Sequence, residues 1–340
     1  CLKARCEALA VRLKDPEVLV PIDIRDDRVW MIEQRIEGLG GYPIGSQDSV
    51  LSLMSGGYDS TVSSYLTMSR GLKTHFCFFN LGGDAHEIGV KQVSNYIWEK
   101  YGSAINVKFI TVPFEEVVGE ILTKVDNAEM GVILKRMMLR AASQVMEGVG
   151  AKALVTGESV AQVSSQTLIN LKVIDQVTEE LVIRPLITTN KQDIIDTAVK
   201  IGTAPFAASM PEFCGVISVK PTTRAKMHRV DKQEANFDFA VLDKAVAEAK
   251  VMSIQNVMDD VEKQYQGEVP VVRMPVGEEI IIDIRHPDEA ANRPLKVSGR
   301  PVKVIPFFAL SSNWQDLDPN VPHLLYCGKG VMSRIHASYL

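Results

Sequence analysis

Two short stretches of this sequence carry residues that could do chemistry. The first is Ser55-Gly-Gly-Tyr-Asp-Ser60, which follows the apolar run Val50–Met54 and precedes a segment with helical spacing. Glycines let backbone N–H groups approach an anion closely, and the start of a helix adds positive potential. The two serine hydroxyls can donate hydrogen bonds, and the Asp59 carboxylate can hold a metal ion or cap the helix. The pattern predicts a phosphate-binding loop between a strand and a helix.

This loop contains no lysine, unlike the Gly-x-x-x-x-Gly-Lys-Ser/Thr loop that binds a transferable γ-phosphate. It resembles instead the pyrophosphate loop of enzymes that split ATP into AMP and pyrophosphate to adenylate a substrate. The alternative is an ordinary Gly-Gly turn with a helix cap. The common register of strand, glycines, both serines and the aspartate favours the phosphate-binding interpretation.

The second stretch is Cys327-Gly-Lys-Gly-Val-Met-Ser-Arg334, which follows the apolar residues Leu324–Tyr326 and precedes a helical start. Its glycines allow a tight turn with inward N–H groups, and such donors lower the pKa of a thiol and stabilise a thiolate or persulfide. A buried structural cysteine is the alternative. Upstream, Asp283-Ile-Arg285 resembles the Asp-x-Arg signature of rhodanese domains, which carry sulfur as a cysteine persulfide.

The chain has 340 residues, of which 46% are hydrophobic and 23% charged, as is typical of a soluble globular protein with two or three domains. Its net charge of −5 does not indicate a nucleic-acid binder, although local basic patches remain compatible with one. No apolar run is long enough to cross a bilayer, and no signal-peptide core is visible, so we predict a cytoplasmic protein without a membrane partner. Because the sequence begins with Cys1 instead of Met, we interpret it as part of a longer chain.

The elements that must position the first loop alternate between strand and helix from Ser49 to about Ile201. Such alternation predicts an α/β fold with a parallel sheet covered on both faces. The expected strands are 50–54, 75–80, 106–112 and 153–156, and the expected helices are 60–70, 87–101, 115–125, 132–148 and 191–201. Ligands bind beyond the carboxyl ends of such strands, so we expect the loops 55–60, 80–83 and 156–159 to converge.

The flanking segments predict smaller elements. Before the first loop we expect a helix over 2–13 and a hairpin of strands 18–25 and 28–36. After it, the charged segment Ala235–Lys263 is interpreted as one long helix, which together with the linker Gly267–Pro275 could act as a hinge. A linker then leads to strands 279–283, 302–306 and 324–326 of a second α/β unit.

An adenylating loop and a persulfide loop in one chain suggest that an oxygen is activated with ATP and then replaced by sulfur. The sequence resembles the family of bacterial tRNA 4-thiouridine synthetases, or tRNA sulfurtransferases, in the long form with a rhodanese domain. The most specific stretches are 53–60, 78–86, 131–142, 155–166, 211–218 and 325–334. One departure is Tyr58, where the family has Phe. The resemblance implies part of a THUMP RNA-binding domain over 1–37, a pyrophosphate-loop adenylation domain over 38–265, a linker over 266–274 and a truncated rhodanese-like domain over 275–340.

The resemblance also implies roles for individual residues. The implied site for ATP and Mg²⁺ consists of Leu53, Met54, Ser55, Gly56, Gly57, Asp59, Ser60, Lys135, Gly157 and Gln166. Within it, Asp59 is the metal ligand, and Lys191 stabilises charge at the reacting phosphate. The substrate is uridine 8 of tRNA. Cys327 receives a persulfide from a cysteine desulfurase, and Cys214 helps to release the sulfur, leaving a Cys214–Cys327 disulfide. The resemblance further implies that the protein supplies sulfur to a sulfur carrier protein of thiamine thiazole synthesis.

The residues alone support these roles unequally. Lys135 and its neighbours Arg136 and Arg140 fit a solvated helix face as well as a cation site, and Gln166 and Lys191 show no distinguishing pattern. The five cysteines, at positions 1, 6, 77, 214 and 327, form no Cys-x-x-Cys pair, which argues against a zinc ribbon and a secreted disulfide framework. The loop thiol at position 214 is either an exposed redox partner or buried, and the one at 77 is expected in the core.

Two basic clusters are candidates for contacts to RNA phosphates. One consists of Lys220, Arg224, Lys226, His228 and Arg229, and the other of Lys3, Arg5, Arg12 and Lys14. A solvated surface is the alternative for each. An enzyme that acts on a base must reach it outside the stack, so we also expect local distortion of the RNA.

Three other functions remain open from the sequence. The chain could be another pyrophosphate-loop enzyme, such as an amidotransferase-coupled synthetase or a 2-thiouridine synthase, which would not need the Cys327 loop. It could be a rhodanese sulfur carrier, which would not need the Asp59 loop. It could also be an RNA-binding or structural protein without ATP turnover. The oligomeric state is open as well, with a homodimer among the alternatives.

Overall fold

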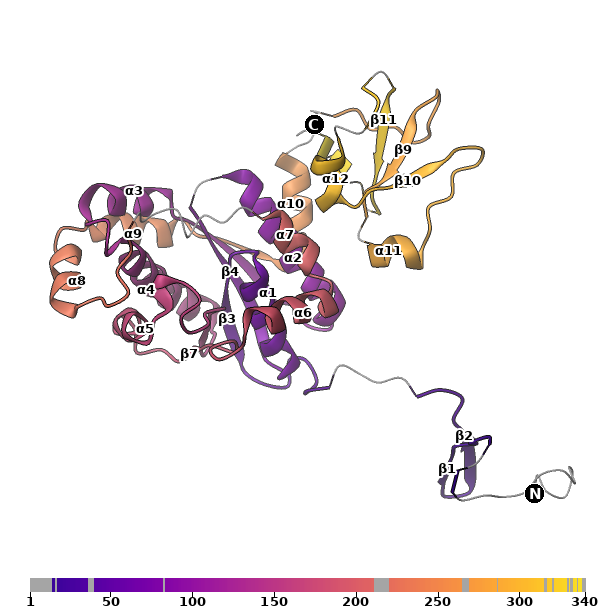
Figure 1. Cartoon of the computed structure of the whole chain (residues 1–340), viewed down its shortest axis with the longest axis horizontal. Coiled ribbons are helices and arrows are strands. Elements are labelled where there is room, and N and C mark those ends of the chain that lie inside the picture. Colours follow the sequence, from indigo (N-terminus) through magenta and orange to yellow (C-terminus); the bar gives the residue numbers. More distant parts are fainter. Residues whose placement is uncertain are drawn as a thin grey trace, which may run out of the picture. The chain divides into compact units, whose positions relative to one another are not determined.

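The structure is a computed structural model that describes residues 14–15, 17–35, 40–81, 83–210, 220–264, 269–285, 287–314, 317–319, 321–328, 330, 333–334 and 336–337. The chain divides into two units, Cys1–Gly40 and Gly41–Leu340. In the first unit, strands β1 (Ile22–Arg25) and β2 (Arg28–Met31) form an antiparallel hairpin (Figure 1). The predicted hairpin is confirmed with shorter strands, and the helix expected over 2–13 lies outside the described residues.

The second unit contains a six-stranded sheet in the order β7-β6-β3-β4-β5-β8. Its strands are β3 (Ser49–Met54), β4 (Lys73–Asn80), β5 (Lys108–Pro113), β6 (Leu154–Val155), β7 (Val182–Ile183) and β8 (Lys250–Ser253). All neighbours pair in parallel except β5 and β8. The parallel-sheet α/β fold is therefore confirmed. The order reverses at β3, since β4 and β5 extend the sheet on one side and β6 and β7 on the other.

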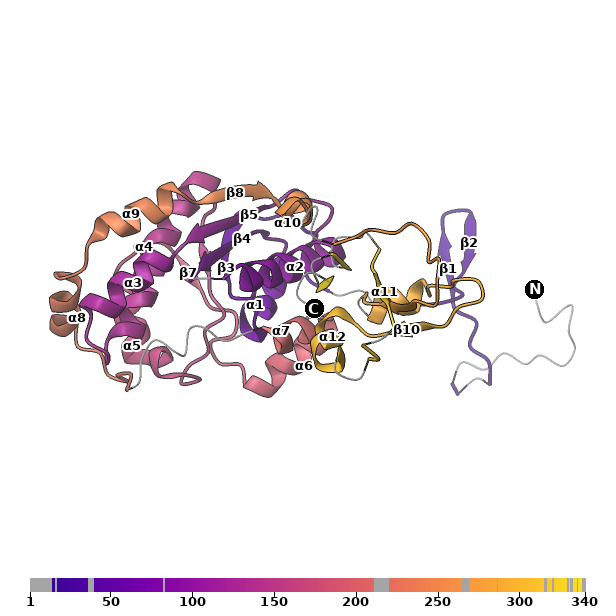
Figure 2. The same cartoon turned by 90° about the horizontal axis from the view of Figure 1, so that it is seen from above.

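Helices cover both faces of this sheet (Figures 1 and 2). On one side, α1 (Tyr58–Ser69) and α2 (Asp84–Tyr101) contact the central strands, and α6 (Lys191–Ile201) packs on α1. The other face carries a second layer, formed by α3 (Glu115–Lys124), α4 (Met130–Val149), α5 (Leu168–Asp175) and α9 (Phe239–Ala247). Strand β4 is buried on both sides, which explains the continuous apolar run Phe76–Phe79 within it. Its Cys77 is a core residue, as predicted, and burial raises the pKa of this thiol.

The single helix predicted over Ala235–Lys263 is wrong. Asp238 ends any such helix, because its side chain accepts a hydrogen bond from the N–H of Ala240 at 2.9 Å and caps the start of α9. Lys250–Ser253 then forms the edge strand β8, and α10 (Val257–Gln264) follows. Pairing of β8 with β5 overrides the local preference of this charged segment for a helix. The hinge, which was inferred from this helix and from the linker after it, thus loses the helix as support and stays a prediction.

A smaller parallel sheet, β10-β9-β11, follows in the same unit. It contains β9 (Ile280–Asp283), β10 (Val302–Val304) and β11 (His323–Tyr326), with α11 (Pro287–Asn292) and α12 (Phe307–Asn313) beside them. Buried Asp283 accepts hydrogen bonds from Arg285 at 2.9 and 2.6 Å, so the Asp-x-Arg pattern is a buried ion pair. Phe307 meets Phe206 of α7 (Ala204–Ser209) with ring centroids 4.9 Å apart. The three expected strands are confirmed, and the division into four domains stays a prediction.

Candidate functional site

The loop after β3 has the predicted strand, glycine turn and helix start. Gly56 has φ of +82°, and a Cβ there would lie 2.9 Å from Met210, so a glycine is required. Helix α1 begins at Tyr58 without a side-chain cap. The Ser60 hydroxyl accepts hydrogen bonds from the N–H and the hydroxyl of Ser55, both at 3.2 Å. The buried Ser60 thus braces the turn, while Ser55 is exposed above it.

The loop after β6 lies directly against this turn. A Cβ on Gly157 would come within 2.6 Å of the Asp59 carbonyl carbon and 2.8 Å of the Ser60 nitrogen, so only glycine permits the contact. On the other side, His86 of α2 donates from Nε2 to the Ser55 carbonyl at 2.9 Å. Burial lowers the pKa of His86, and this hydrogen bond opposes that shift only in part. These contacts confirm that the predicted loops 55–60 and 156–159 converge, and they do so where the strand order reverses. Near the third predicted loop, 80–83, the contact comes from His86 of the following helix, so the convergence of that loop stays a prediction.

Asp59 and Lys191 are 132 residues apart in sequence but form an ion pair at this edge. The Lys191 ammonium, at the first residue of α6, lies 2.8 and 2.9 Å from the two Asp59 oxygens. Gln162 donates to the same carboxylate at 2.9 Å. The two paired side chains are 25% and 45% exposed, so solvent and a ligand can reach the pair.

Lys135 is held at the site by Glu158, the residue after Gly157. Its ammonium lies 2.6 Å from one Glu158 oxygen, and Arg184 binds the other at 2.8 Å. Burial alone would raise the pKa of Glu158, but Lys135 and Arg184 together lower it to about 2. Arg184 in turn donates to Asp175 at 2.9 Å. Lys135 is therefore fixed by a buried carboxylate and is not part of a solvated charged face.

The two arginines near Lys135 have a structural role instead. Arg136 is 2% exposed and binds both oxygens of Glu234, at 2.7 and 2.9 Å. Arg140 binds the same carboxylate at 3.0 Å. Glu234 belongs to α8 (Met227–Glu234), so these pairs attach α8 to α4. For Arg136, the alternative of a solvated face is wrong.

The other predicted nucleotide-site residues differ in how far they are buried; they are Gln166, Leu53 and Met54. Gln166 is 9% exposed, and its Oε1 is buried without a hydrogen-bond partner among the described residues. Leaving such a buried acceptor unpaired costs about 1–3 kcal/mol, which a ligand donor would offset. Met54 is buried and accepts a hydrogen bond from Ser64 at its sulfur, whereas Leu53 is only partly buried.

The second chemical loop begins at Cys327, directly after β11. Cys327 is a free thiol and 8% exposed. Its sulfur accepts a hydrogen bond from the Ser333 N–H at 3.4 Å and lies 3.5 Å from the Ser333 hydroxyl. Gly330 has φ of +79°, which a tight turn requires here. One backbone N–H, that of Ser333, therefore donates to the sulfur, and the wider ring of donors expected from the glycines stays a prediction. Cys214 and Lys329 lie outside the described residues.

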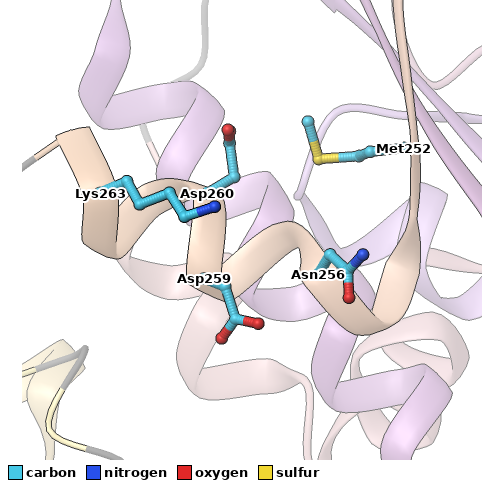
Figure 3. Close-up of a pocket in the computed structure, with 5 residues that line it drawn as sticks. All are labelled: Met252, Asn256, Asp259, Asp260 and Lys263. Carbon is cyan, nitrogen blue, oxygen red and sulfur yellow. The ribbon is translucent and has the colours of Figure 1, made fainter.

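A pocket of about 300 Å³ elsewhere on the surface is not part of either loop (Figure 3). It lies over β8, the short helix Ile254–Asn256 and α10, and it is lined by Met252, Asn256, Asp259, Asp260 and Lys263. Asp260 already pairs with buried Lys91 at 3.0 Å, and Lys91 also pairs with Glu87 at 2.8 Å. This pocket is therefore a surface hollow beside a structural ion-pair network.

In the part of the chain that the structure describes, no three His, Cys, Asp or Glu side chains gather to hold a metal ion. None of the helices described here has the length and the apolar run needed to cross a bilayer.

Sequence reasoning missed four residues that shape the site: Glu158, Arg184, Gln162 and His86. Glu158 lies inside a strand-end loop that the sequence singled out, so the same rule that drew attention to Gly157 could have included it. Arg184 follows β7, a strand of two residues that leaves no periodic pattern. Gln162 and His86 become visible only through the contacts between loops.

Comparison with known proteins agrees with this architecture. The strand-order reversal and the glycine loop at it define an α/β protein of the class that binds ligands beyond its strand ends. Residues 45–239 match the model of the family described as "Thiamine biosynthesis protein (ThiI)". The tRNA sulfurtransferase of Pseudomonas putida is 56% identical over 339 residues, which cover all of this chain and 70% of that protein. The tRNA sulfurtransferase of Photobacterium profundum is 54% identical over 342 residues, with the same coverage.

A solved structure is similar as well. It is a crystal structure of a 4-thiouridine synthetase–RNA complex with bound ATP, with a TM-score of 0.67 and 27% identity over 74% of this chain and 67% of that one. The chain belongs to the tRNA sulfurtransferase (ThiI) family and is an enzyme of the transferase class.

Proposed function

We propose that the chain adenylates uridine 8 of tRNA with ATP and replaces O4 with sulfur from a Cys327 persulfide, giving 4-thiouridine. One observation carries the proposal. At the strand-order reversal, two loops are in contact through Gly157. Glu158 of one loop holds Lys135 and Asp59 of the other holds Lys191, so both lysines are anchored beside the turn that we expect to bind an anion. The similar 4-thiouridine synthetase structure, which contains RNA and ATP, supports the same substrate and nucleotide.

The described residues fit ATP. The turn at Gly56 and the start of α1 offer backbone N–H groups to phosphates, and Lys135 and Lys191 supply two positive charges. The unpaired Gln166 Oε1 can accept a hydrogen bond from a ligand donor such as an adenine amino group. The partly buried Leu53 can contact the base, whereas Met54 is buried and supports the site by packing in the core beneath it.

The residues also fit one Mg²⁺ ion bound together with ATP. Mg²⁺ is usually held by one or two carboxylates, substrate phosphates and water, and Asp59 offers one accessible carboxylate. A bound Mg²⁺ neutralises charge that develops on the phosphates. Asp59 would hold this ion, and Lys191, which pairs with Asp59 in this structure, would lie beside it and stabilise charge at the reacting phosphate. Lys135 would stay with Glu158, which a second cation also holds.

The sulfur step uses the Cys327 loop. A cysteine desulfurase delivers sulfur to Cys327, whose Sγ already accepts a hydrogen bond from the Ser333 N–H, a donor that can stabilise negative charge on sulfur at this position. The terminal sulfur of the persulfide then attacks C4 of the adenylated uridine and displaces AMP, which gives a Cys327–S–S–C4 adduct. The Cys214 thiolate attacks the Cys327 sulfur and breaks this S–S bond, so that 4-thiouridine is released and a Cys214–Cys327 disulfide forms, which a reductant must open before the next turnover. A cytoplasmic location and a homodimer belong to the same proposal.

The test follows labelled sulfur from cysteine to tRNA in the presence of a desulfurase, with and without ATP. We expect labelling that requires ATP, disappears in Cys327→Ala, and survives in the control Cys77→Ala, whose thiol is buried in β4. Nucleoside analysis should identify the labelled base as 4-thiouridine. A 2-thiouridine product would favour a different pyrophosphate-loop enzyme, and labelling without ATP would rule out the adenylation step.

A second role in thiazole synthesis is favoured by the description of the matched family as a thiamine biosynthesis protein. In this role Cys327 passes sulfur to a sulfur carrier protein, and the nucleotide loop is not needed. Asp59→Ala should therefore abolish tRNA thiolation but leave growth without thiamine intact. Thiamine auxotrophy of an Asp59→Ala strain would contradict the separation of the two roles.

A further inference from the structure

A group of exposed basic side chains lies on α8 and on the segment before it. We call it the basic strip, and it consists of Lys220, Arg224, Lys226, His228, Arg229 and Lys232, all of them exposed. Within 220–234, five lysines and arginines stand against Asp231 and Glu234, which gives a net charge of +3 in a chain of net charge −5. The strip is therefore a local departure from the charge of the whole chain.

The charge of the basic strip is largely uncompensated. Among the described residues, the lysines of the strip and Arg224 make no ion pair, and the contact of Arg229 with Glu129 is long, at 3.8 Å. Glu234 faces inward. Burial would raise its pKa, but its pairs with Arg136 and Arg140 lower it. The carboxylate that could neutralise the strip is thus occupied on the inner side of α8.

Hydrogen bonds hold the strip in place. The fully buried Asn170 of α5 donates to the Thr222 carbonyl and accepts from the Ala225 N–H, both at 2.8 Å. Thr167 donates to the Thr223 carbonyl at 2.8 Å, and the Thr222 N–H donates to the Ala128 carbonyl at 2.9 Å. Because the backbone is already ordered, binding a partner here loses little conformational entropy.

The strip also lies beside the candidate nucleotide site. The amide of Asn170 that binds Thr222 donates to the Ser164 carbonyl as well, again at 2.8 Å. Ser164 begins the short helix Ser164–Gln166, which carries the unpaired Gln166 Oε1. Figures 1 and 2 both place α8 at the outer end of the helical layer that contains α3 and α5.

We propose that the basic strip binds the phosphate backbone of the RNA substrate and guides it toward the strand-end site. The inference rests on the proposed function, since it assumes that tRNA is the substrate. Several positive charges along one exposed segment match a polyanion with regularly spaced phosphates, and release of its counterions drives such binding. The contacts position the RNA and do not read its sequence.

The experiment compares the full-length chain with two triple variants. The test variant is Lys220→Gln, Arg224→Gln and Lys226→Gln. The control is Lys108→Gln, Lys152→Gln and Lys200→Gln, which removes the same charge from exposed lysines elsewhere. Affinity for unmodified tRNA is measured at several salt concentrations, and sulfur transfer is measured as a function of tRNA concentration. Circular dichroism checks that both variants fold.

We expect the test variant to bind tRNA roughly tenfold to hundredfold more weakly, with a salt slope reduced by about 1 for each lost contact. Its KM for tRNA should rise while kcat at saturating tRNA stays unchanged, and the control should behave like the wild type. A test variant that binds tRNA as the control does would overturn the inference and leave the proposed function intact. A wild-type chain that neither binds nor thiolates tRNA would overturn both.

Discussion

Glu158→Gln should destabilise the part of the chain that contains the six-stranded sheet, because it leaves the partly buried Lys135 and Arg184 without the Glu158 carboxylate. The pKa of Glu158 lies at about 2 in the folded chain, against 4.5 for an ordinary glutamate. At about 1.4 kcal/mol per pKa unit, this difference corresponds to roughly 3 kcal/mol of stability at neutral pH. Breaking a buried ion pair by removing one partner costs about 3–5 kcal/mol in general, which agrees.

The sign of the pH dependence follows from the lowered pKa. Glu158 stabilises the folded state fully above pH 4.5, and this contribution is lost as the pH falls toward 2. The stability difference between wild type and Glu158→Gln should therefore be largest at neutral pH. It should shrink below pH 4.5.

Urea unfolding followed by the fluorescence of Trp98 measures this difference. Trp98 is buried in α2 and donates to the Ile105 carbonyl at 2.8 Å, so its fluorescence reports on the part of the chain that contains the six-stranded sheet. Trp30→Phe and Trp314→Phe in every variant leave it as the single tryptophan. The matched control is Glu179→Gln, an exposed glutamate nearby in sequence. We expect the control to lie within about 0.5 kcal/mol of the parent.

A double-mutant cycle with Lys135→Met isolates the contact itself. If the 2.6 Å ion pair carries much of the cost, the two changes together should cost at least about 1 kcal/mol less than the sum of their separate costs. A loss below about 1 kcal/mol for Glu158→Gln would refute the reasoning, because the pKa shift would then have no counterpart in stability. A loss that does not change between pH 7 and pH 3 would refute it as well.

Two further outcomes are expected. Gly157→Ala should lower the free energy of unfolding by about 1–3 kcal/mol and reduce ATP-dependent thiolation, because the new Cβ would meet the Asp59 backbone. The control Gly119→Ala should change neither property, because its Cβ meets nothing within 4 Å. Urea unfolding measures the stability, and the labelled-sulfur assay measures the thiolation. Neutral His75 accepts a hydrogen bond from the Lys108 N–H, and burial lowers its pKa to about 4. The unfolded chain takes up this proton near pH 6.5, so stability should fall as the pH drops from 6.5 to 4. If the urea midpoint of the wild type falls no more between pH 6.5 and pH 4 than that of the His75→Asn variant, the pH dependence does not come from His75.

The sequence was a sufficient guide where burial leaves a local pattern. Strand β4 is buried on both faces, and its residues Phe76–Phe79 form a continuous apolar run that marks a central parallel strand. The loop at Gly56 could be predicted as well, because strand, glycines, hydroxyl residues and helix start follow one another in a single register. The family resemblance added Lys135 and Lys191, which have no local pattern of their own.

The sequence was insufficient where long-range contacts decide. Strand β8 exists because it pairs with β5, and its charged surroundings look helical when they are read alone. The pair of Asp59 with Lys191 joins residues far apart in the chain, so no spacing rule could find it. The burial of Arg136 depends in the same way on Glu234, which comes from a helix that was not predicted at all.

The two lysines at the candidate site differ in a way that separates their roles. Lys135 and Lys191 each bind a carboxylate, at 2.6 and 2.8 Å, so the site is internally neutralised. Glu158 is buried and shared with Arg184, so Lys135 is held by a carboxylate that stays in place, and breaking this pair is costly. Asp59 is more accessible and pairs with a single cation, so separating Lys191 from it costs little. In the proposed reaction, Lys135 would therefore fix the position of a phosphate, and Lys191 would be the lysine that can move with the developing charge.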